Sequence, residues 1–355
     1  MRDDHVVGLV ANPASARDIR RLVAQGGAVT TNQKLNLISR LLTGLASTGV
    51  DRVVSMTDLG GISGGLARLA AGPAGDRWPR LDFVELPLTR TEADTTAAVE
   101  SMVRSGVRAI AVLGGDGTNR VVAESCGDTP IASISTGTNN AFPRSHEPTV
   151  VGIATGLIAT SIVPPDAGTY RSKMLTVVHG ARRERALVDV AVTDHDVVAS
   201  GSVWDPGRIH ELFLCFAEPH AIGLSSIGAH VRPVRRDATT GLHLRLGRPA
   251  LARVHAPIAP GLVVDVAISA ADDLHPGQAV DVEPRSGVLA IDGERAFRLR
   301  KQDRVTVTLD HEGPVSIDVA RTMDHASREG ALADRLPPVR APTQHATSTS
   351  RGGPP

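Results

Sequence analysis

Cysteine is scarce in this chain, and long apolar runs are missing from it. Only Cys126 and Cys215 occur among 355 residues, so a disulfide framework is excluded, and neither belongs to a C-x-x-C pair of metal ligands. We interpret both as buried thiols of a protein in a reducing compartment. We find no export signal and no run of about 18 to 20 apolar residues, so we expect no membrane span and a cytoplasmic location.

The chain also lacks a net charge. Lys+Arg and Asp+Glu both number 38, which gives a formal charge of zero. A chain without an overall field has no general attraction to nucleic acid or to an anionic membrane, so neither is an expected partner. Aromatic residues make up only 2% of the chain. The core must therefore be built from Val, Leu, Ile and Ala.

The first part of the chain alternates between strand and helix patterns. An apolar run over residues 6–11, closed by Asn12-Pro13, predicts a buried strand and a turn. The same reasoning predicts further strands over 53–56, 81–86, 108–113 and 131–135, and helices over 36–46, 91–103 and 119–124. This alternation is typical of a parallel sheet with helices on both faces, so we expect an α/β domain over residues 1–145.

The pattern changes after about Ser161. Short β-rich runs separated by turn residues follow one another, at 174–178, 186–192, 212–216, 242–246, 263–268, 287–291, 305–309 and 315–319. They predict an all-β, sandwich-like second domain over residues 146–325. From Ala326 onward Pro, Ser and Thr replace any apolar period, so we expect a disordered tail over 326–355.

The most informative motif is the turn Gly114-Gly115-Asp116-Gly117-Thr118, which joins a predicted strand to a predicted helix. Glycines in such a turn let backbone N–H groups approach an anion, and the helix N-terminus adds a favourable dipole. Asp116 can accept a proton from a hydroxyl or hold a magnesium ion beside phosphates. The alternative is a plain tight turn in which Asp116 caps the helix.

A second polar group follows the next predicted strand, in Ser135-Thr136-Gly137-Thr138-Asn139-Asn140. Its hydroxyls and amides suit ribose hydroxyls or phosphate oxygens. The alternative is a hydroxyl-rich turn that caps a helix. Because consecutive parallel strands end at one edge of a sheet, we expect the two turns to meet.

These motifs carry a family resemblance. Gly114 to Thr118 matches the glycine-aspartate motif of the NAD kinase and diacylglycerol kinase superfamily, and Gly137 to Phe142 resembles the later Gly-Thr-Gly-Asn-Asp-Phe of its lipid-kinase branch. Asn12-Pro13 looks like that branch's turn after the first strand. The run as far as about Val319 most resembles the NAD-kinase-like acetoin catabolism protein X type. The resemblance implies a Rossmann-like first domain, a β-rich second domain and an active site in the cleft between them.

The resemblance also suggests residues in the second domain. Ala186 to Val192 is similar to the strand whose polar pair contacts the dinucleotide in NAD kinases, with Asp189 as the acid and Val188 in place of the asparagine. Asp292-Gly293-Glu294 looks like the late Asp-Gly-Glu of the lipid kinases, although Asp-Gly is also what a two-residue hairpin turn requires. We interpret Arg235-Arg236 as part of a solvated face.

We therefore expect a kinase that uses ATP with magnesium, or polyphosphate as an alternative donor, to phosphorylate a hydroxyl of NAD or a related small molecule. Alternatives are a lipid kinase and a nucleotide-binding regulator without catalysis, and we expect a homo-oligomer. Asp116 is the predicted catalytic residue and a predicted magnesium ligand. The predicted nucleotide- and acceptor-binding residues are Gly114, Gly115, Gly117, Thr118, Asn119, Gly137, Thr138, Asn139, Asn140, Asp189 and Glu294.

Overall fold

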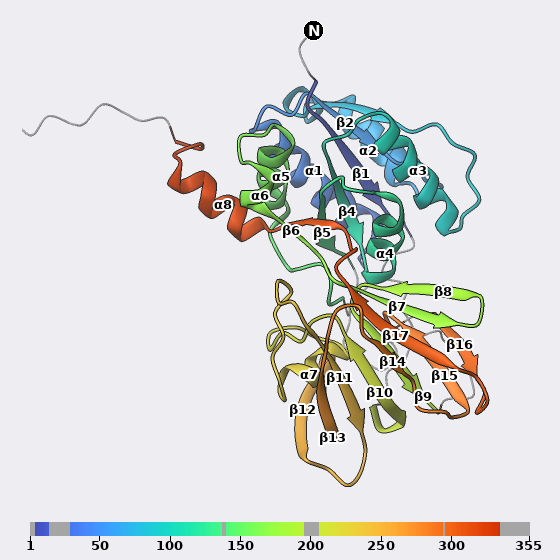
Figure 1. Cartoon of the computed structure of the whole chain (residues 1–355). Helices are drawn as coiled ribbons and strands as arrows, with labels where there is room; N and C mark the ends of the chain where they lie inside the picture. Colours follow the sequence, from blue (N-terminus) through green and yellow to red (C-terminus); the bar gives the residue numbers. More distant parts are fainter. Residues whose placement is uncertain (1–3, 14–28, 137–139, 195–205, 294, 334–355) are drawn as a thin grey trace, which may run out of the picture.

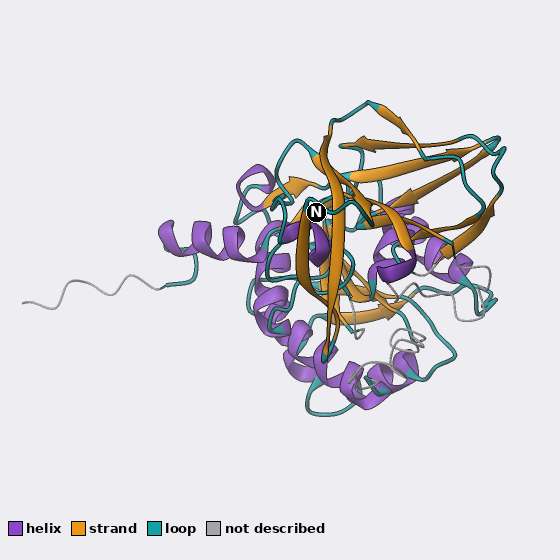
Figure 2. Cartoon of the chain, turned by 90° about the horizontal axis from the view of Figure 1, so that it is seen from below, coloured by secondary structure: helices purple, strands orange, loops and turns teal. Residues whose placement is uncertain are grey.

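The chain folds into an α/β part and a β-rich part (Figure 1). The computed structural model describes residues 4–13, 29–136, 140–194, 206–293 and 295–333. Helices gather in one part of the molecule and strands dominate the other, as Figure 2 shows. The fold class expected from the sequence is confirmed.

A seven-stranded sheet forms the centre of the first part, in the order β3-β2-β1-β4-β5-β18-β6. The pairs from β3 to β5 are parallel, and β6 runs antiparallel to β18. The chain order reverses between the neighbours β1 and β4, which is where open α/β sheets bind ligands. The strands are β1 (Val6–Ala11), β2 (Arg52–Ser55), β3 (Arg80–Phe83), β4 (Ala109–Gly114), β5 (Ile131–Ser135), β6 (Thr169–Arg171) and β18 (Val315–Ile317).

Helices cover both faces of this sheet. One face packs in a single apolar cluster with α1 (Thr31–Ala46), α2 (Ile62–Ala70), α5 (Pro148–Ala159) and α8 (Val319–Arg328). The other face packs against α3 (Glu92–Arg104) and α4 (Asp116–Ser125). Short helices lie at η2 (Gly75–Arg77) and α6 (Pro165–Gly168).

Glycines let α1 and α5 pack closely. A Cβ atom on Gly44 would lie 2.2 Å from the carbonyl oxygen of Thr149, and one on Gly152 would lie 2.2 Å from that of Leu41. Only hydrogen fits at these two positions.

The start of α1 is set by a capping box between Thr30 and Gln33, which satisfies backbone N–H groups that the first turn leaves open.

Two antiparallel sheets form the second part. The larger has the order β12-β13-β11-β10-β9-β15-β16 and the smaller β14-β17-β7-β8. A short η3 (Pro206–Arg208) and α7 (Ser225–Ala229) complete it. The strands are β7 (Met174–His179), β8 (Arg182–Ala186), β9 (Asp189–Thr193), β10 (Ile209–Leu214), β11 (Gly241–Leu246), β12 (Ala252–Ala259), β13 (Leu262–Leu274), β14 (Ala279–Asp281), β15 (Gly287–Ile291), β16 (Arg295–Leu299) and β17 (Val305–Asp310).

The first part does not end near residue 145, where the sequence places its boundary. The chain continues through α5, α6 and β6 before it enters the second part, and it returns at the end as β18 and α8. The outgoing and returning segments lie side by side, because the hydroxyls of Ser172 and Ser316 are 2.7 Å apart and the backbone N–H of Ser172 donates to the carbonyl of Pro314. The first domain is thus built from both ends of the described chain.

Two further expectations differ from the structure. The run 186–192 is not one strand, because β8 ends at Ala186 in the smaller sheet and β9 begins at Asp189 in the larger one. The expected tail from Ala326 begins too early, because α8 continues to Arg328, and residues 334–355 lie outside the described chain.

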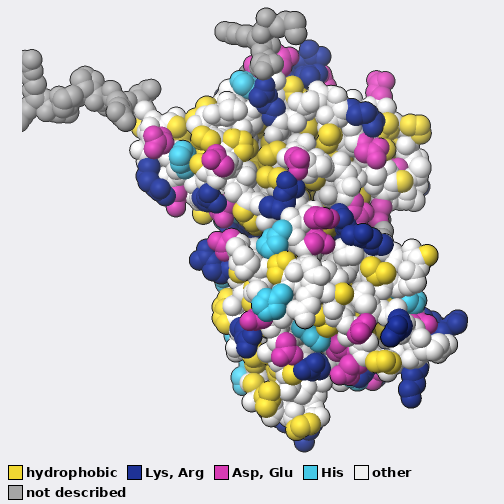
Figure 3. All heavy atoms as spheres, in the orientation of Figure 1, with side chains coloured by type: hydrophobic (Ala, Val, Ile, Leu, Met, Phe, Trp, Pro, Cys, Tyr) yellow, Lys and Arg dark blue, Asp and Glu magenta, His cyan; other side chains and the backbone are white. Residues whose placement is uncertain are grey.

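Acidic and basic side chains are interspersed on the face shown in Figure 3, in keeping with the zero net charge.

Candidate active site between the two domains

The glycine turn after β4 is compact because neighbouring side chains occupy the space that larger residues would need. A Cβ atom on Gly114 would lie 2.5 Å from the Cβ of Thr118, and one on Gly115 would lie 2.8 Å from Oδ1 of Asn140. Gly115 is the N-cap of α4, and Gly117 and Thr118 lie in the first turn of that helix. The turns after β4 and β5 therefore meet, as the sequence predicts.

Asp116 joins these two turns. Its Oδ1 accepts the backbone N–H groups of Ala141 and Phe142 at 3.2 and 2.8 Å, and its Oδ2 accepts that of Ala141 at 3.0 Å. The side chain is buried, with 9% of the residue exposed. Hydrogen bonds from two peptide groups fix the direction of the carboxylate, which capping of α4 alone would not do. Asp116 thus holds the second turn in place as well as lying at the start of the helix.

The turn after β1 joins the same site. Asn12 follows β1, and its Nδ2 donates to the hydroxyl of Thr118 at 2.9 Å across the point where the strand order reverses. Lys34 of α1 donates from Nζ to the carbonyls of Asn12 and Pro13, at 2.9 and 3.0 Å. Lys34 is 2% exposed, and sequence reasoning missed it because a lysine in an amphipathic helix is usually solvated.

Two predicted ligands brace the turns. Asn119 is fully buried, donates to the carbonyl of Gly115 at 2.9 Å and accepts the hydroxyl of Ser133 at 2.6 Å. Asn140 donates to the hydroxyl of Ser135 at 3.0 Å. Both side chains therefore bond to protein atoms that shape the site. The predicted residues Gly137, Thr138 and Asn139 lie outside the described residues.

The second domain contributes a buried carboxylate in the turn of the β15–β16 hairpin. Asp292 accepts the backbone N–H groups of Leu187, Val188 and Asp189, at 3.1, 2.8 and 3.3 Å. With a φ of 48°, Asp292 lies in the turn between β15 and β16, and because Ile291 pairs with Arg295 this turn is longer than the two-residue turn expected from Asp-Gly. These bonds hold the chain where it crosses from β8 to β9, which explains why the expected single strand is split.

Asp189 and Glu294 were the predicted ligands near this hairpin. Asp189 begins β9 and is 5% exposed, so its side chain does not face solvent. Its backbone carbonyl accepts the N–H of Asp292 at 2.9 Å. Glu294 lies outside the described residues.

Arg120 connects α4 to this hairpin. Its guanidinium is buried and lies 3.2 Å from Glu124, 3.4 Å from Glu92 and 3.9 Å from Asp292. Burial raises the pKa of Asp292, and the three backbone N–H groups and Arg120 oppose that rise. The helix that begins at Asp116 is thus tied to the second domain through one buried arginine, which the sequence reasoning did not single out.

Arg236 makes a second connection between the domains, and its interpretation as a solvated residue was wrong. Arg235 fits that interpretation, with its side chain 81% exposed beside Asp237. Arg236 is 7% exposed, and its Nε donates to Glu218 at 2.9 Å. Burial opposes ionisation of Glu218, but the charge of Arg236 and its hydrogen bond outweigh burial and lower the pKa of Glu218.

A magnesium ion fits this donor set only in the company of phosphate. Among the described residues no group of three or more His, Cys, Asp or Glu side chains converges as a metal site. Magnesium in kinases is usually held by one or two carboxylates together with phosphate oxygens and water. Asp116 can supply one such carboxylate.

In the part of the chain that the structure describes, no helix is long and apolar enough to cross a membrane.

The chain is similar to known proteins over both domains. Residues 7–162 match the ATP-NAD kinase N-terminal domain, and residues 173–312 match the acetoin catabolism protein X C-terminal domain. Acetoin catabolism protein X of Cupriavidus necator is 42% identical over 332 residues, which cover 91% of this chain and 92% of that protein. A crystal structure from Bacillus anthracis str. Sterne, provisionally assigned as a diacylglycerol kinase, has 12% identity and a TM-score of 0.44 over 90% of this chain and 99% of its own. The chain belongs to the acetoin catabolism protein X family, with a first domain of the NAD kinase type.

Proposed function

We propose that this protein is a kinase that transfers a phosphoryl group from ATP to a hydroxyl of NAD or a related small molecule. The observation that carries the proposal is the meeting of three strand-end turns, after β1, β4 and β5, around the N-terminus of α4 and the carboxylate of Asp116. Phosphoryl transfer depends mainly on positioning and on neutralising charge, and these turns are suited to both.

Each element of the site has a role in this proposal. The backbone at Gly114, Gly115 and Gly117 would cradle phosphate oxygens, with the dipole of α4 directed at them. Asp116 would orient or deprotonate the attacking hydroxyl, or hold the magnesium ion that arrives with the nucleotide. When bound, that ion neutralises charge on the transferred phosphate. Asp189, at the edge of the second domain that is tied to α4, would bind the acceptor.

A second candidate is a nucleotide-binding regulator without catalysis. One observation favours it: both carboxylate oxygens of Asp116 already accept backbone N–H groups. A carboxylate used in that way has a structural task whether or not it also acts on a substrate.

Assays with labelled ATP and magnesium test the proposal. Purified protein is offered NAD, NADH, small polyols and diacylglycerol in micelles, with polyphosphate as the donor in a parallel series. We expect labelled NADP, and a loss of at least about a hundredfold in rate for Asp116→Ala. The matched control is Asp128→Ala, which removes an exposed carboxylate just beyond α4 that pairs with Arg171.

The outcomes separate the candidates. Labelling of NAD, with the control unchanged, supports the proposal, and labelling of diacylglycerol alone would assign a lipid acceptor instead. Calorimetric binding of ADP without transfer to any acceptor favours the regulator. Absence of both ADP binding and transfer would refute a nucleotide site at these turns.

A further inference from the structure

Arg236 of the second domain forms hydrogen bonds with the turn that follows β5. Its Nη1 donates to the carbonyl of Phe142 and its Nη2 donates to the carbonyl of Ala141. Arg236 lies in the segment between α7 and β11, so this contact crosses from one domain to the other. A guanidinium can hold two adjacent carbonyls at once because its N–H groups form a rigid planar fork.

The same two residues are also held by Asp116. Ala141 and Phe142 donate their N–H groups to that carboxylate, and their carbonyls accept Arg236. A first-domain acid and a second-domain base thus fix one short stretch of backbone between them. Any movement of Arg236 acts on the peptide groups that orient Asp116.

The position of Arg236 is itself well supported. Its Nε donates to Glu218, and its guanidinium carbon lies 4.1 Å from the centre of the Phe216 ring. Lys173 donates from Nζ to the carbonyls of Arg235 and Thr240, at 2.9 and 2.7 Å. Lys173 therefore anchors both ends of the short segment that carries the arginine.

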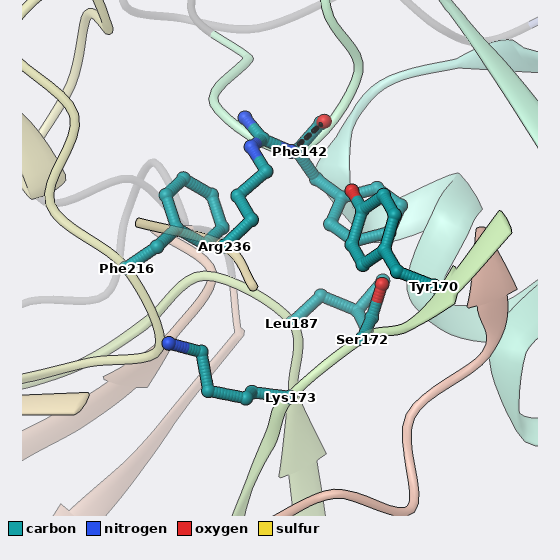
Figure 4. Close-up of a pocket in the computed structure, with 7 residues that line it drawn as sticks. All are labelled: Phe142, Tyr170, Ser172, Lys173, Leu187, Phe216 and Arg236. Carbon is teal, nitrogen blue, oxygen red and sulfur yellow. Dashed lines mark hydrogen bonds between the residues drawn. The ribbon is translucent and has the colours of Figure 1, made fainter. Parts of the chain in front are cut away.

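These groups surround one small cavity (Figure 4). Phe142, Tyr170, Ser172 and Leu187 line it together with Lys173, Phe216 and Arg236. The space has room for about one water molecule, so it is too small for a substrate. The packing around Arg236 is tight and joins both domains. Such packing suits a residue that fixes the position of neighbouring groups, and it does not suit a ligand pocket.

We infer that Arg236 is a positioning residue, through which the second domain sets the orientation of Asp116 and of the turn at residues 140–142. The inference rests on the proposed kinase function for its catalytic consequence only. Small displacements of reacting groups slow a reaction strongly, by about a hundredfold for about 1 Å. The effect should therefore fall on kcat, while the affinity for ATP at the glycine turn changes little.

Arg236→Met tests this because methionine keeps much of the alkyl stem and removes the fork. The matched control is Arg235→Met, since the side chain of Arg235 is 81% exposed and pairs with Asp237 at 2.8 Å. Three quantities are measured for each variant: kcat and KM for ATP, urea denaturation, and hydrogen exchange of a peptide that covers residues 140–146. For Arg236→Met we expect kcat to fall at least about thirtyfold with KM within about threefold, and exchange to rise in that peptide.

The outcomes distinguish this inference from the proposed function. A kcat within about threefold of the parent value and unchanged exchange at residues 140–146 would overturn it. So would a fall in stability with exchange raised evenly along the chain, because that pattern describes a purely structural residue. If the parent transfers phosphate to no acceptor, the proposed function fails. Local exchange at residues 140–146 then decides alone whether Arg236 positions the turn.

Discussion

Replacing Asp116 by Asn changes little in size and removes one acceptor and the negative charge. One amide oxygen can keep the contacts of Oδ1, but the amide nitrogen then faces the N–H of Ala141, where Oδ2 accepts at 3.0 Å. A hydrogen bond to a charged group is worth about 1.5 to 3 kcal/mol. A carboxylate at a helix N-terminus contributes about 0.3 to 1 kcal/mol more. We therefore expect Asp116→Asn to lower the free energy of unfolding by about 2 to 4 kcal/mol.

Urea denaturation and hydrogen exchange at residues 140–146 measure this effect without any assumption about activity. Exchange at Ala141 and Phe142 should rise, because these amides lose a charged acceptor. Ser125→Ala is the matched control at the other end of α4, since the Ser125 hydroxyl makes only a long bond of 3.4 Å to the carbonyl of Val121. If Asp116→Asn matched that control in both measurements, the carboxylate would not be holding the turn, and the reasoning would be refuted.

Three further predictions concern the surroundings of the site. Gly115→Ala would place a Cβ atom 2.8 Å from Oδ1 of Asn140, so calorimetry should show ADP bound at least about tenfold more weakly. The control is Gly64→Ala, whose Cβ meets no atom closer than 3.8 Å, and we expect it to bind ADP as the parent does. Asp292→Asn turns an amide donor toward backbone N–H groups in a buried site, and we expect a loss of about 3 to 5 kcal/mol in urea denaturation; a loss below about 1 kcal/mol would contradict it. Burial lowers the pKa of Lys173 to about 8 from 10.5. Between these two values the unfolded chain therefore binds more protons than the folded one. We expect the free energy of unfolding, relative to that of Lys173→Met, to rise from about pH 8 to about pH 10.5.

Local chemistry determined much of this protein from the sequence alone. The α/β alternation predicted β1 to β5 with α1, α3 and α4, but not α2, because hydrophobic period and turn residues act over a few neighbours. The glycine turn at Gly114 to Thr118 and the approach of the turn at Asn140 followed from the rule that parallel strands end at one edge of the sheet. The resemblance to the family rested on the same short motifs, and it is confirmed over nearly the whole chain.

The tertiary structure decided which partners the polar residues have. Arg236 has an ordinary loop sequence around it, and its burial depends on Glu218 and Phe216, which lie about twenty residues earlier in the chain. The return of β18 to the first sheet and the break at Leu187–Val188 depend likewise on pairing between distant segments. Hydrogen bonds and ion pairs of this kind form only when the whole chain has folded, because no local pattern encodes the distance between residues far apart in sequence. The sequence could therefore point to Asp116, but only the folded chain shows that both domains hold it in place.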